Sequence, residues 1–462
     1  MPKPVAVIGG GITGLSAAFQ LVSTGHRVAM FEREQRLGGK IDEVSLDGTT
    51  IPTGPDAFLA RRHEVTDLVK EIGLGNALTS PTARSARIYR DGTLHPLPPN
   101  VLGVPATADL SSTGLISPAG AAIAARGPDS SSGAERSEWP DESVGALVRR
   151  ELGDEVLEFL VDPLLGGINA GDSDQLSLVA GVPQLDALRK REGSLLDAAA
   201  STVAEAKQRE NSSEPEPVFH SIEGGLGRLV ERISDVLDAS GLFDLHLGPT
   251  TSLERTGDGW RINELEADHV ISTIPAHSTA QLVNGFAPEI SERLFRIDYS
   301  SVALTILTLA PNTINIDAAI SGVLVPRTLG HHVTAVSVAS HKWPGLAAQG
   351  QQVLRVSVGR RTDERWTEVG DDELLAVIER DLSEIFGIEV RATHSVITRW
   401  LKSLPQYDVG HLDLIRSIDE QLAGHVGLHL TGAWRDGLGL PACVGAGRNA
   451  ARAVTAQLTQ NA

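Results

Sequence analysis

The sequence is most constrained by a glycine-rich turn that lies between a short apolar segment and an amphipathic one near the amino terminus. Residues 5–8 are all apolar, as in a buried parallel strand, and the spacing Gly9-x-Gly11-x-x-Gly14 follows at once. In such a turn the first glycine allows a sharp bend, the second lets the backbone approach a pyrophosphate, and the third lets the next helix pack against the strand. The turn therefore predicts a dinucleotide site.

The residues after the turn fit the same interpretation. Leu15, Ala18, Phe19 and Val22 recur at helical spacing, which predicts a helix whose N-terminus offers N–H groups and a positive dipole end to a phosphate. A second apolar segment ends at Glu32, whose carboxylate can accept a hydrogen bond from a ribose 2′-hydroxyl and disfavours a 2′-phosphate. A tight turn without a ligand is the alternative, but strand, spacing, helix and acidic residue all agree with a nucleotide.

Composition argues against several classes of function. The 462 residues suit two or three domains, and a formal net charge of −19 argues against nucleic acid and anionic membranes as general partners. No apolar run approaches the ~20 residues of a membrane span, and the chain begins in a strand rather than a signal peptide, so we expect a cytoplasmic protein. The 14 histidines show no ligand spacing, and we predict no metal site. Cys443, the single cysteine, is expected to be a buried apolar residue.

Periodicity and turn residues predict the elements of the first half. We expect a helix over 64–72, a hairpin over 86–97, a solvated loop within 103–143 and helical segments over 141–160, with Asp162-Pro163 as a helix breaker. Residues 164–178 contain too many small residues for an ordinary helix surface. Their glycines could let the backbone approach a flat ligand or could serve helix packing, and the spacing alone does not decide between the two.

The second half begins after a polar tract at 207–217, which marks a boundary. A helix is expected to open at Gly224-Gly225, followed by short strands near 243–247, 258–263 and 269–274. Residues 298–424 favour an antiparallel sheet backed by one long helix over 371–386. At the carboxyl end a strand precedes Gly445-Ala446-Gly447, where we expect a helix to begin. This closing unit suits a nucleotide domain split along the chain, and an unrelated packing unit is the alternative.

Several stretches along the whole chain share one resemblance. They are VIGGGITGL at 7–15, RLGGK at 36–40, GPDAFLARR at 54–62, YRDGTLHPLP at 89–98, LGGINAGDSDQLSL at 165–178, EGGLGRLV at 223–230, ADHVISTIPA at 267–276, LPQYDVGH at 404–411 and LTGAWRDGLGLPACVGAGRNAA at 430–451. Their order and spacing resemble the oxygen-dependent porphyrinogen oxidases, a branch of the flavin amine oxidase superfamily that makes porphyrins.

The resemblance implies an α/β and α+β fold with FAD as cofactor. A Rossmann-like FAD-binding domain would be assembled from three separated segments, 1–85, 211–285 and 425–462. A helical substrate-binding insert would span 86–210, and a mixed-sheet substrate domain would span 286–424.

Carried over position by position, the resemblance also implies which residues line FAD. These are Gly9, Gly10, Gly11, Ile12, Thr13, Gly14, Glu32, Arg33, Gly39, Lys40, Gly54, Pro55, Asp56, Ala57, Thr250, Trp400, Leu438, Gly439 and Leu440. Thr53 and Ala442 depart from the family, which often has acidic residues at these positions. Mitochondrial and plant protoporphyrinogen enzymes carry an arginine after the hairpin where this chain has Leu102, and in this the chain resembles the soluble coproporphyrinogen oxidases of Gram-positive bacteria.

The reaction that the resemblance implies belongs to heme biosynthesis. Coproporphyrinogen III would lose six electrons in three steps to give coproporphyrin III, with O2 as acceptor and H2O2 as product. Because the flavin would carry the chemistry, we predict no catalytic side chains. Gly167 and Asn169 are the predicted substrate wall, and cations for the propionates are expected among Arg61, Arg62, Arg87 and Lys190.

Three other functions stay open at this point. The substrate could be protoporphyrinogen IX, whose two propionates require less positive charge. The chain could instead be an amine oxidase, although three tyrosines and six tryptophans make an aromatic cage less favourable. It could also bind FAD as a non-catalytic protein. A transient contact with a downstream heme-pathway chelatase is a further hypothesis, and the sequence does not address the oligomeric state.

Overall fold

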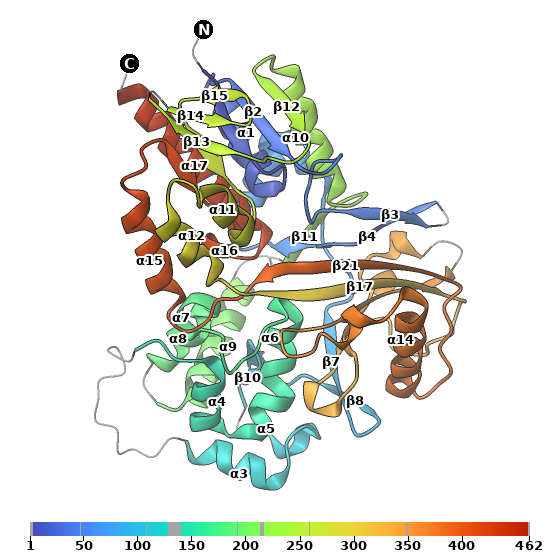
Figure 1. Cartoon of the computed structure of the whole chain (residues 1–462). Coiled ribbons are helices and arrows are strands. Elements are labelled where there is room, and N and C mark those ends of the chain that lie inside the picture. The colour runs from blue at the N-terminus through green and yellow to red at the C-terminus, as the bar shows by residue number, and fades with distance from the viewer. Residues whose placement is uncertain are drawn as a thin grey trace. The chain divides into compact units, whose positions relative to one another are not determined.

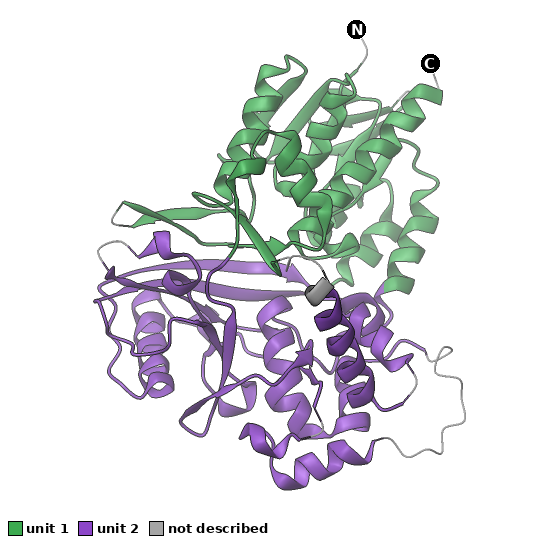
Figure 2. Ribbon diagram, turned by 180° about the vertical axis from the view of Figure 1, so that it is seen from behind, with its two compact units in different colours: residues 1–80, 217–298, 412–462 green, residues 81–216, 299–411 purple. Residues whose placement is uncertain are grey.

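The computed structural model describes residues 3–46, 48–107, 109–127, 140–191, 193–212, 217–257, 259–347 and 350–460. The chain forms two compact units (Figure 2), the first from residues 1–80, 217–298 and 412–462 and the second from residues 81–216 and 299–411. The predicted segment 86–210 and residues 299–411 of the predicted segment 286–424 thus fall in one unit. The boundaries between the units follow residues 80, 216, 298 and 411, whereas the predicted boundaries follow residues 85, 210, 285 and 424.

The first unit is organised around a five-stranded parallel sheet in the order β12-β2-β1-β16-β22, of which β2 and β12 are labelled in Figure 1. Its strands are β1 (Val5–Ile8), β2 (Val28–Glu32), β12 (Phe243–Leu247), β16 (Val270–Ser272) and β22 (Leu428–Leu430). All four residues of β1 are buried, as expected for the central strand of a parallel sheet with both faces covered. The predicted strand, turn and helix order at the amino terminus is confirmed.

Three long helices share a core with this sheet: α1 (Ile12–Ser23), α10 (Gly227–Ala239) and α17 (Leu440–Gln460). The helix expected to open at Gly224-Gly225 begins at Gly227, and its Leu229, Ile233 and Leu237 are buried. The predicted start of the last helix at Gly445 is wrong, because α17 already begins at Leu440. Pro441 stands in its first turn, where the missing N–H of proline removes no helical hydrogen bond.

Smaller elements complete the first unit. They are β3 (Glu43–Leu46), β4 (Thr49–Pro52), β5 (Phe58–Leu59), α2 (His63–Glu71), β6 (Leu78–Thr79), β11 (Phe219–Ile222), β13 (Leu253–Thr256), β14 (Gly259–Ile262), β15 (Leu265–Ala267), α11 (Ala276–Val283), α12 (Pro288–Phe295) and α16 (Ala433–Asp436). Helix α15 (His411–Leu422) begins at the last residue of the second unit.

The second unit contains a seven-stranded sheet in the order β21-β17-β20-β19-β18-β7-β8. Its strands are β7 (Ser85–Arg90), β8 (Thr93–Pro96), β17 (Tyr299–Leu309), β18 (Ile320–Leu324), β19 (Val333–Val338), β20 (Gln352–Val358) and β21 (His394–Pro405). Only the β18–β7 pair is parallel, so the sheet is mixed. Helix α14 (Asp371–Phe386) packs on one face, where Leu374 and Ile378 share a core with Val356. The hairpin β7–β8 was predicted correctly, but it extends this sheet and is not part of the helical region.

The helical region of the second unit follows the hairpin. Its elements are β9 (Asn100–Val101), β10 (Val104–Pro105), α3 (Pro118–Arg126), α4 (Val144–Leu152), α5 (Asp154–Val156), a π-helical turn (Leu157–Val161), α6 (Asp162–Asn169), α7 (Leu178–Gly181), α8 (Pro183–Arg189) and α9 (Leu195–Ser212). The stretch predicted as a loop, 127–143, follows α3 and precedes α4, and its residues 128–139 lie outside the described residues.

Asp162-Pro163 does not break the helix, contrary to the prediction. The chain stays helical from α5 through the π-helical turn into α6, with Pro163 in the first turn of α6. A proline inside an α-helix clashes with the carbonyl group four residues earlier. The π-helical turn changes the backbone bonding from i−4 to i−5 immediately before Pro163, which relieves this conflict.

Candidate cofactor and substrate sites

The glycine turn between β1 and α1 is the best-defined part of the first unit's candidate site. Gly9 has a φ of +107°, and its N–H donates to the Phe31 carbonyl at 2.8 Å. A methyl group on Gly14 would overlap the Gly9 carbonyl oxygen, whereas one on Gly11 would meet no atom within 4 Å. The turn is therefore closely packed at Gly14 and open at Gly11, which fits a backbone cradle for a phosphate group.

Glu32 is fixed at the edge of this turn. Its Oε2 accepts a hydrogen bond from the Gly10 N–H at 2.6 Å, and its Oε1 accepts one from the Glu34 N–H at 2.8 Å. The Gly248 N–H donates to the Glu32 carbonyl at 2.7 Å, so the segment that leads to Thr250 passes beside it. Each carboxylate oxygen keeps a lone pair that a ribose hydroxyl can use.

Lys40 lies near the same turn, because the preceding Gly39 packs against Gly11. The Gly38 N–H donates to the Gly10 carbonyl at 2.9 Å, which holds the segment 36–40 against the glycines. The Lys40 side chain is accessible to solvent, yet desolvation by the surrounding protein lowers the pKa of its ammonium group. Across the described residues, no hydrogen bond or ion pair holds this ammonium. An accessible but desolvated cation without an acidic partner suits an anionic or electron-rich ligand.

The start of α17 reaches the same place. Leu438 and Gly439 precede this helix and Leu440 begins it, and the Cys443 N–H donates to the Gly439 carbonyl at 3.0 Å. Cys443 is buried, as predicted, and burial raises the pKa of its thiol while Thr13 and Lys40 act in the opposite direction. The first unit thus brings the glycine turn, Lys40 and the start of α17 together from the two ends of the chain.

The other predicted residues of the first unit lie nearer to its surface. Arg33 is exposed and bonds to Glu34. The stretch Gly54 to Ala57 follows β4, and the Thr53 N–H before it donates to the Asp42 carbonyl. Arg61 and Arg62 are exposed, and Arg62 forms an ion pair with Glu64 at 2.5 Å. Arg62 is therefore already paired with a carboxylate of its own unit.

In the second unit, the residues predicted to form a substrate wall lie at the end of α6. Gly167 and Ile168 are exposed, with Ile168 at 58%. Asn169 is buried. Its side-chain oxygen accepts a hydrogen bond from the Gly171 N–H, and its backbone carbonyl accepts one from Gln406 Nε2, both at 3.1 Å. The exposed surface of the wall is thus Gly167 and Ile168, whereas Asn169 fixes the loop.

Trp400 and Arg87 lie on opposite faces of the seven-stranded sheet. A methyl group on Gly167 would contact Leu324 at 3.5 Å, so α6 covers the Leu324 face. Cross-strand pairs place Ala335, Ser357 and Leu304 on the same face as Leu324. Val302, two residues before Leu304, lies on this face too, and its partner Trp400 therefore shares it. Arg87 neighbours Ile88, the partner of Leu324, and therefore points to the α14 face. Its guanidinium bonds to the Ser85 hydroxyl there.

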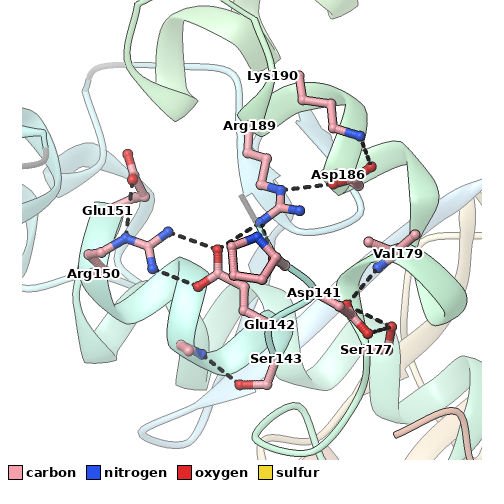
Figure 3. Close-up of polar contacts among 12 residues, drawn as sticks. Asp141, Glu142, Ser143, Arg150, Glu151, Ser177, Val179, Asp186, Arg189 and Lys190 are labelled. Atoms are coloured by element: carbon pink, nitrogen blue, oxygen red, sulfur yellow. Dashed lines mark hydrogen bonds and ion pairs between the residues drawn. The ribbon is translucent and has the colours of Figure 1, made fainter. Parts of the chain in front are cut away.

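Lys190 belongs to an ion-pair network in the helical region (Figure 3). Its ammonium donates to Asp186 at 2.6 Å, and Asp186 also accepts from Arg189 at 2.8 Å. The Arg189 side chain is only 1% exposed and reaches Glu142 as well. Arg189 links the helices of this region, and Lys190 is a second cation on the Asp186 carboxylate that Arg189 already contacts.

Sequence reasoning missed an ionic cluster around Asp162, which is 2% exposed at the start of α6. Its Oδ1 accepts from the Ser173 hydroxyl at 2.7 Å, and its Oδ2 lies 3.4 Å from Arg327 Nε and 3.6 Å from Arg360 Nη1. Arg327 also pairs with Asp172 at 3.0 Å. The acidic residues near 172 were visible in the sequence, but no signal pointed to arginines more than 150 residues away.

The profile of flavin containing amine oxidoreductases matches residues 12–455. The chain belongs to this family. It is therefore a flavoprotein, and its glycine cradle fits the nucleotide part of such a cofactor. Within the described ranges, no three His, Cys, Asp or Glu side chains gather as metal ligands, and no helix is long and apolar enough to cross a membrane.

Individual members of this flavoprotein family are similar over almost the whole chain. Coproporphyrinogen III oxidase of Bacillus subtilis is 34% identical, with 97% of each chain covered. Protoporphyrinogen oxidase 1 of Spinacia oleracea is 28% identical, with 97% of this chain and 83% of the relative covered. A crystal structure from Exiguobacterium sp. 255-15 has a TM-score of 0.85 at 31% identity, with 99% of both chains covered. The fold and the resemblance to porphyrinogen oxidases are confirmed.

Proposed function

We propose that this flavoprotein is an FAD-dependent oxidase of heme biosynthesis that converts coproporphyrinogen III to coproporphyrin III. Similarity to a coproporphyrinogen III oxidase over 97% of both chains carries this proposal. We further propose O2 as the electron acceptor and H2O2 as the product. Contact with a chelatase and the cytoplasmic location stay predictions.

The residues of the first unit would hold the cofactor by its nucleotide part. The open backbone at Gly11 and the N-terminus of α1 would receive the pyrophosphate, and Glu32 would accept a hydrogen bond from the adenosine ribose. Lys40 is desolvated and has no acidic partner, so its ammonium would face an anionic or electron-rich group of the flavin cofactor. When bound, the flavin supplies the electron chemistry, so the chain's own task is to orient the substrate and exclude water.

The second unit would supply the substrate wall. Gly167 carries no side chain and Ile168 is apolar, so the end of α6 presents a surface that suits a flat tetrapyrrole. Four propionates require cations in an acidic protein. Arg62 and Lys190 are already paired with carboxylates, and Arg87 points to the α14 face. Of the four predicted cations, this leaves Arg61 as the most available.

Anaerobic mixing of purified holoprotein with coproporphyrinogen III tests the proposal. We expect the flavin absorbance to bleach and porphyrin fluorescence to appear, followed by recovery of the flavin spectrum and formation of peroxide when O2 is admitted. An unbleached flavin would indicate a non-catalytic FAD-binding protein. Turnover of a polyamine without porphyrinogen turnover would indicate an amine oxidase.

Protoporphyrinogen IX oxidation is the second candidate, since a protoporphyrinogen oxidase is among the similar proteins. Parallel assays with the two porphyrinogens at equal enzyme concentration separate the candidates. We expect a higher kcat/KM for coproporphyrinogen III. The opposite order would replace our proposal with the protoporphyrinogen reaction.

A further inference from the structure

Strand β21 departs from regular pairing with β17 immediately after Trp400. Ser300 pairs with Leu404 and Val302 pairs with Trp400, so a single residue of β17 lies opposite three residues of β21. The two strands run side by side at the edge of the sheet (Figure 1). Lys402, the middle of the three, has a φ of +43°, which glycine adopts freely and lysine does not. The fold therefore holds a lysine in an unfavourable backbone conformation.

This β-bulge is held by a specific contact. The Lys402 N–H donates to the Ser301 hydroxyl at 3.1 Å, and Ser301 is only 4% exposed. Bulges of this kind redirect side chains and occur preferentially beside functional sites. Backbone strain that the surrounding structure maintains is in turn concentrated at such sites.

The Lys402 side chain is exposed, and no carboxylate of the described residues lies within ion-pairing distance of its ammonium. Lys3 and Lys190, by contrast, pair with Glu266 and Asp186. The chain has 59 acidic and 40 basic residues, so acidic partners are plentiful. Lys402 is thus an exposed cation without an ion pair among the described residues, and it is available to a carboxylate from outside the chain.

Lys402 also lies on a strand that reaches the predicted substrate wall. Trp400, two residues earlier, shares the face of the sheet on which α6 packs. Gln406, four residues later, donates to the Asn169 carbonyl at the end of α6. Four extended residues span about 13 Å, so Lys402 stands apart from the wall along the same strand. An anchor at that separation suits a charged substituent on the rim of a large flat ligand.

We propose that Lys402 binds a propionate carboxylate of the tetrapyrrole and so helps to select coproporphyrinogen III, which carries four propionates, over protoporphyrinogen IX, which carries two. This inference rests on the proposed function. Lys402 is a specificity residue and takes no part in electron transfer. Its ammonium forms charge-assisted hydrogen bonds with the carboxylate.

Substitution of Lys402 tests the proposal. For Lys402→Ala we expect KM for coproporphyrinogen III to rise about tenfold, with kcat unchanged within about twofold, because only a binding contact is lost. Lys402→Arg should restore KM. The effect on protoporphyrinogen IX should be smaller. Lys70→Ala is the matched control, since Lys70 is an exposed lysine on α2 that forms no ion pair among the described residues.

Lys402→Gly separates binding from structure. Glycine relieves the backbone strain, so the melting temperature should rise by about 1–3 °C while KM rises as in Lys402→Ala. If Lys402 only protects an edge strand from association, KM should be unchanged in every variant, and the variants that lack this lysine should aggregate more. That result would overturn the proposal.

Fluorescence titration of each variant with coproporphyrin III gives a readout that does not depend on turnover. We expect Lys402→Ala to bind the porphyrin about tenfold more weakly than Lys70→Ala. If the unaltered protein fails to oxidise coproporphyrinogen III, the proposed function fails, and the titration still decides the role of Lys402. Equal affinities of the two variants would overturn the inference.

Discussion

The glycine turn of the first unit and the loop after α6 in the second unit are both held firmly, but by different interactions. Around Gly9 and Gly14, backbone atoms pack against backbone atoms within one short stretch of sequence. Around Asp162, ionised side chains from separate segments, including Arg327 and Arg360, balance one another. The first region should therefore be sensitive to added volume, and the second should be sensitive to lost charge.

Adding a methyl group to the glycine turn is expected to have the largest effect. In Gly14→Ala the new atom would overlap the Gly9 carbonyl oxygen, and backbone cannot move aside as a flexible side chain can. We expect a loss of more than about 3 kcal/mol in folding stability and little flavin-containing protein. Thermal unfolding and the flavin absorbance of purified protein measure both.

Gly11→Ala is the matched variant, because its methyl group meets no protein atom within 4 Å. The melting temperature of the flavin-free protein should change by less than about 3 °C, whereas flavin affinity should fall about tenfold because the methyl group occupies the approach to the pyrophosphate. Unchanged flavin affinity would show that this open space is not the phosphate cradle.

Neutralising Asp162 is the corresponding test of the second region. Asp162→Asn keeps the volume but leaves two largely buried guanidinium groups without their shared carboxylate, which should cost about 3 kcal/mol and lower the melting temperature by about 10 °C. In Asp174→Asn the carboxylate removed is 38% exposed, so the cost should stay below about 1 kcal/mol. Equal effects of the two substitutions would mean that burial does not determine the strength of this cluster.

The same difference explains which features could be predicted from the sequence. The strand, glycines and helix at residues 5–23 are close in sequence, and hydrophobic period and spacing specify them. The start of α17 was predicted wrongly at Gly445, because the glycines there drew more weight than Pro441, which is typical of a first helical turn. The bulge at Lys402 could not be predicted, because it depends on Ser301, about a hundred residues earlier. The continuation of the helix past Asp162-Pro163 depends on a π-helical turn that has no sequence signature.

Acidification should destabilise the first unit before the second. Burial, and next the neighbouring His269, lower the pKa of His429 on β22 to about 4, against roughly 6.5 in an unfolded chain. The unfolded chain therefore takes up a proton that the folded unit excludes. Above about pH 6.5 this histidine costs the folded unit no stability, and as the pH falls towards 4 the cost rises to about 3 kcal/mol.

In the second unit, the hydrogen bond from Arg149 holds the pKa of Asp174 below its usual range. Its contribution is therefore retained until the pH falls below about 4. Flavin release on heating, followed between pH 7 and 4.5, reports on the first unit. His429→Gln should flatten this dependence, and a slope that persists in the variant would assign the effect to other groups.

A loss of flavin affinity as large as that of Gly11→Ala is expected at Glu32, where the cradle depends on a charged side chain as the Asp162 cluster does. In Glu32→Gln a single oxygen must replace the two that now accept from Gly10 and Glu34, so one backbone N–H loses its acceptor. We expect FAD affinity to fall about tenfold, or ~1.4 kcal/mol, with little change in the melting temperature of the flavin-free protein. FMN lacks the adenosine ribose that Glu32 is proposed to bind, so its affinity should be unaffected. Equal losses for both flavins would place Glu32 in support of the turn rather than on the ribose, and the two regions would then share one mode of stabilisation.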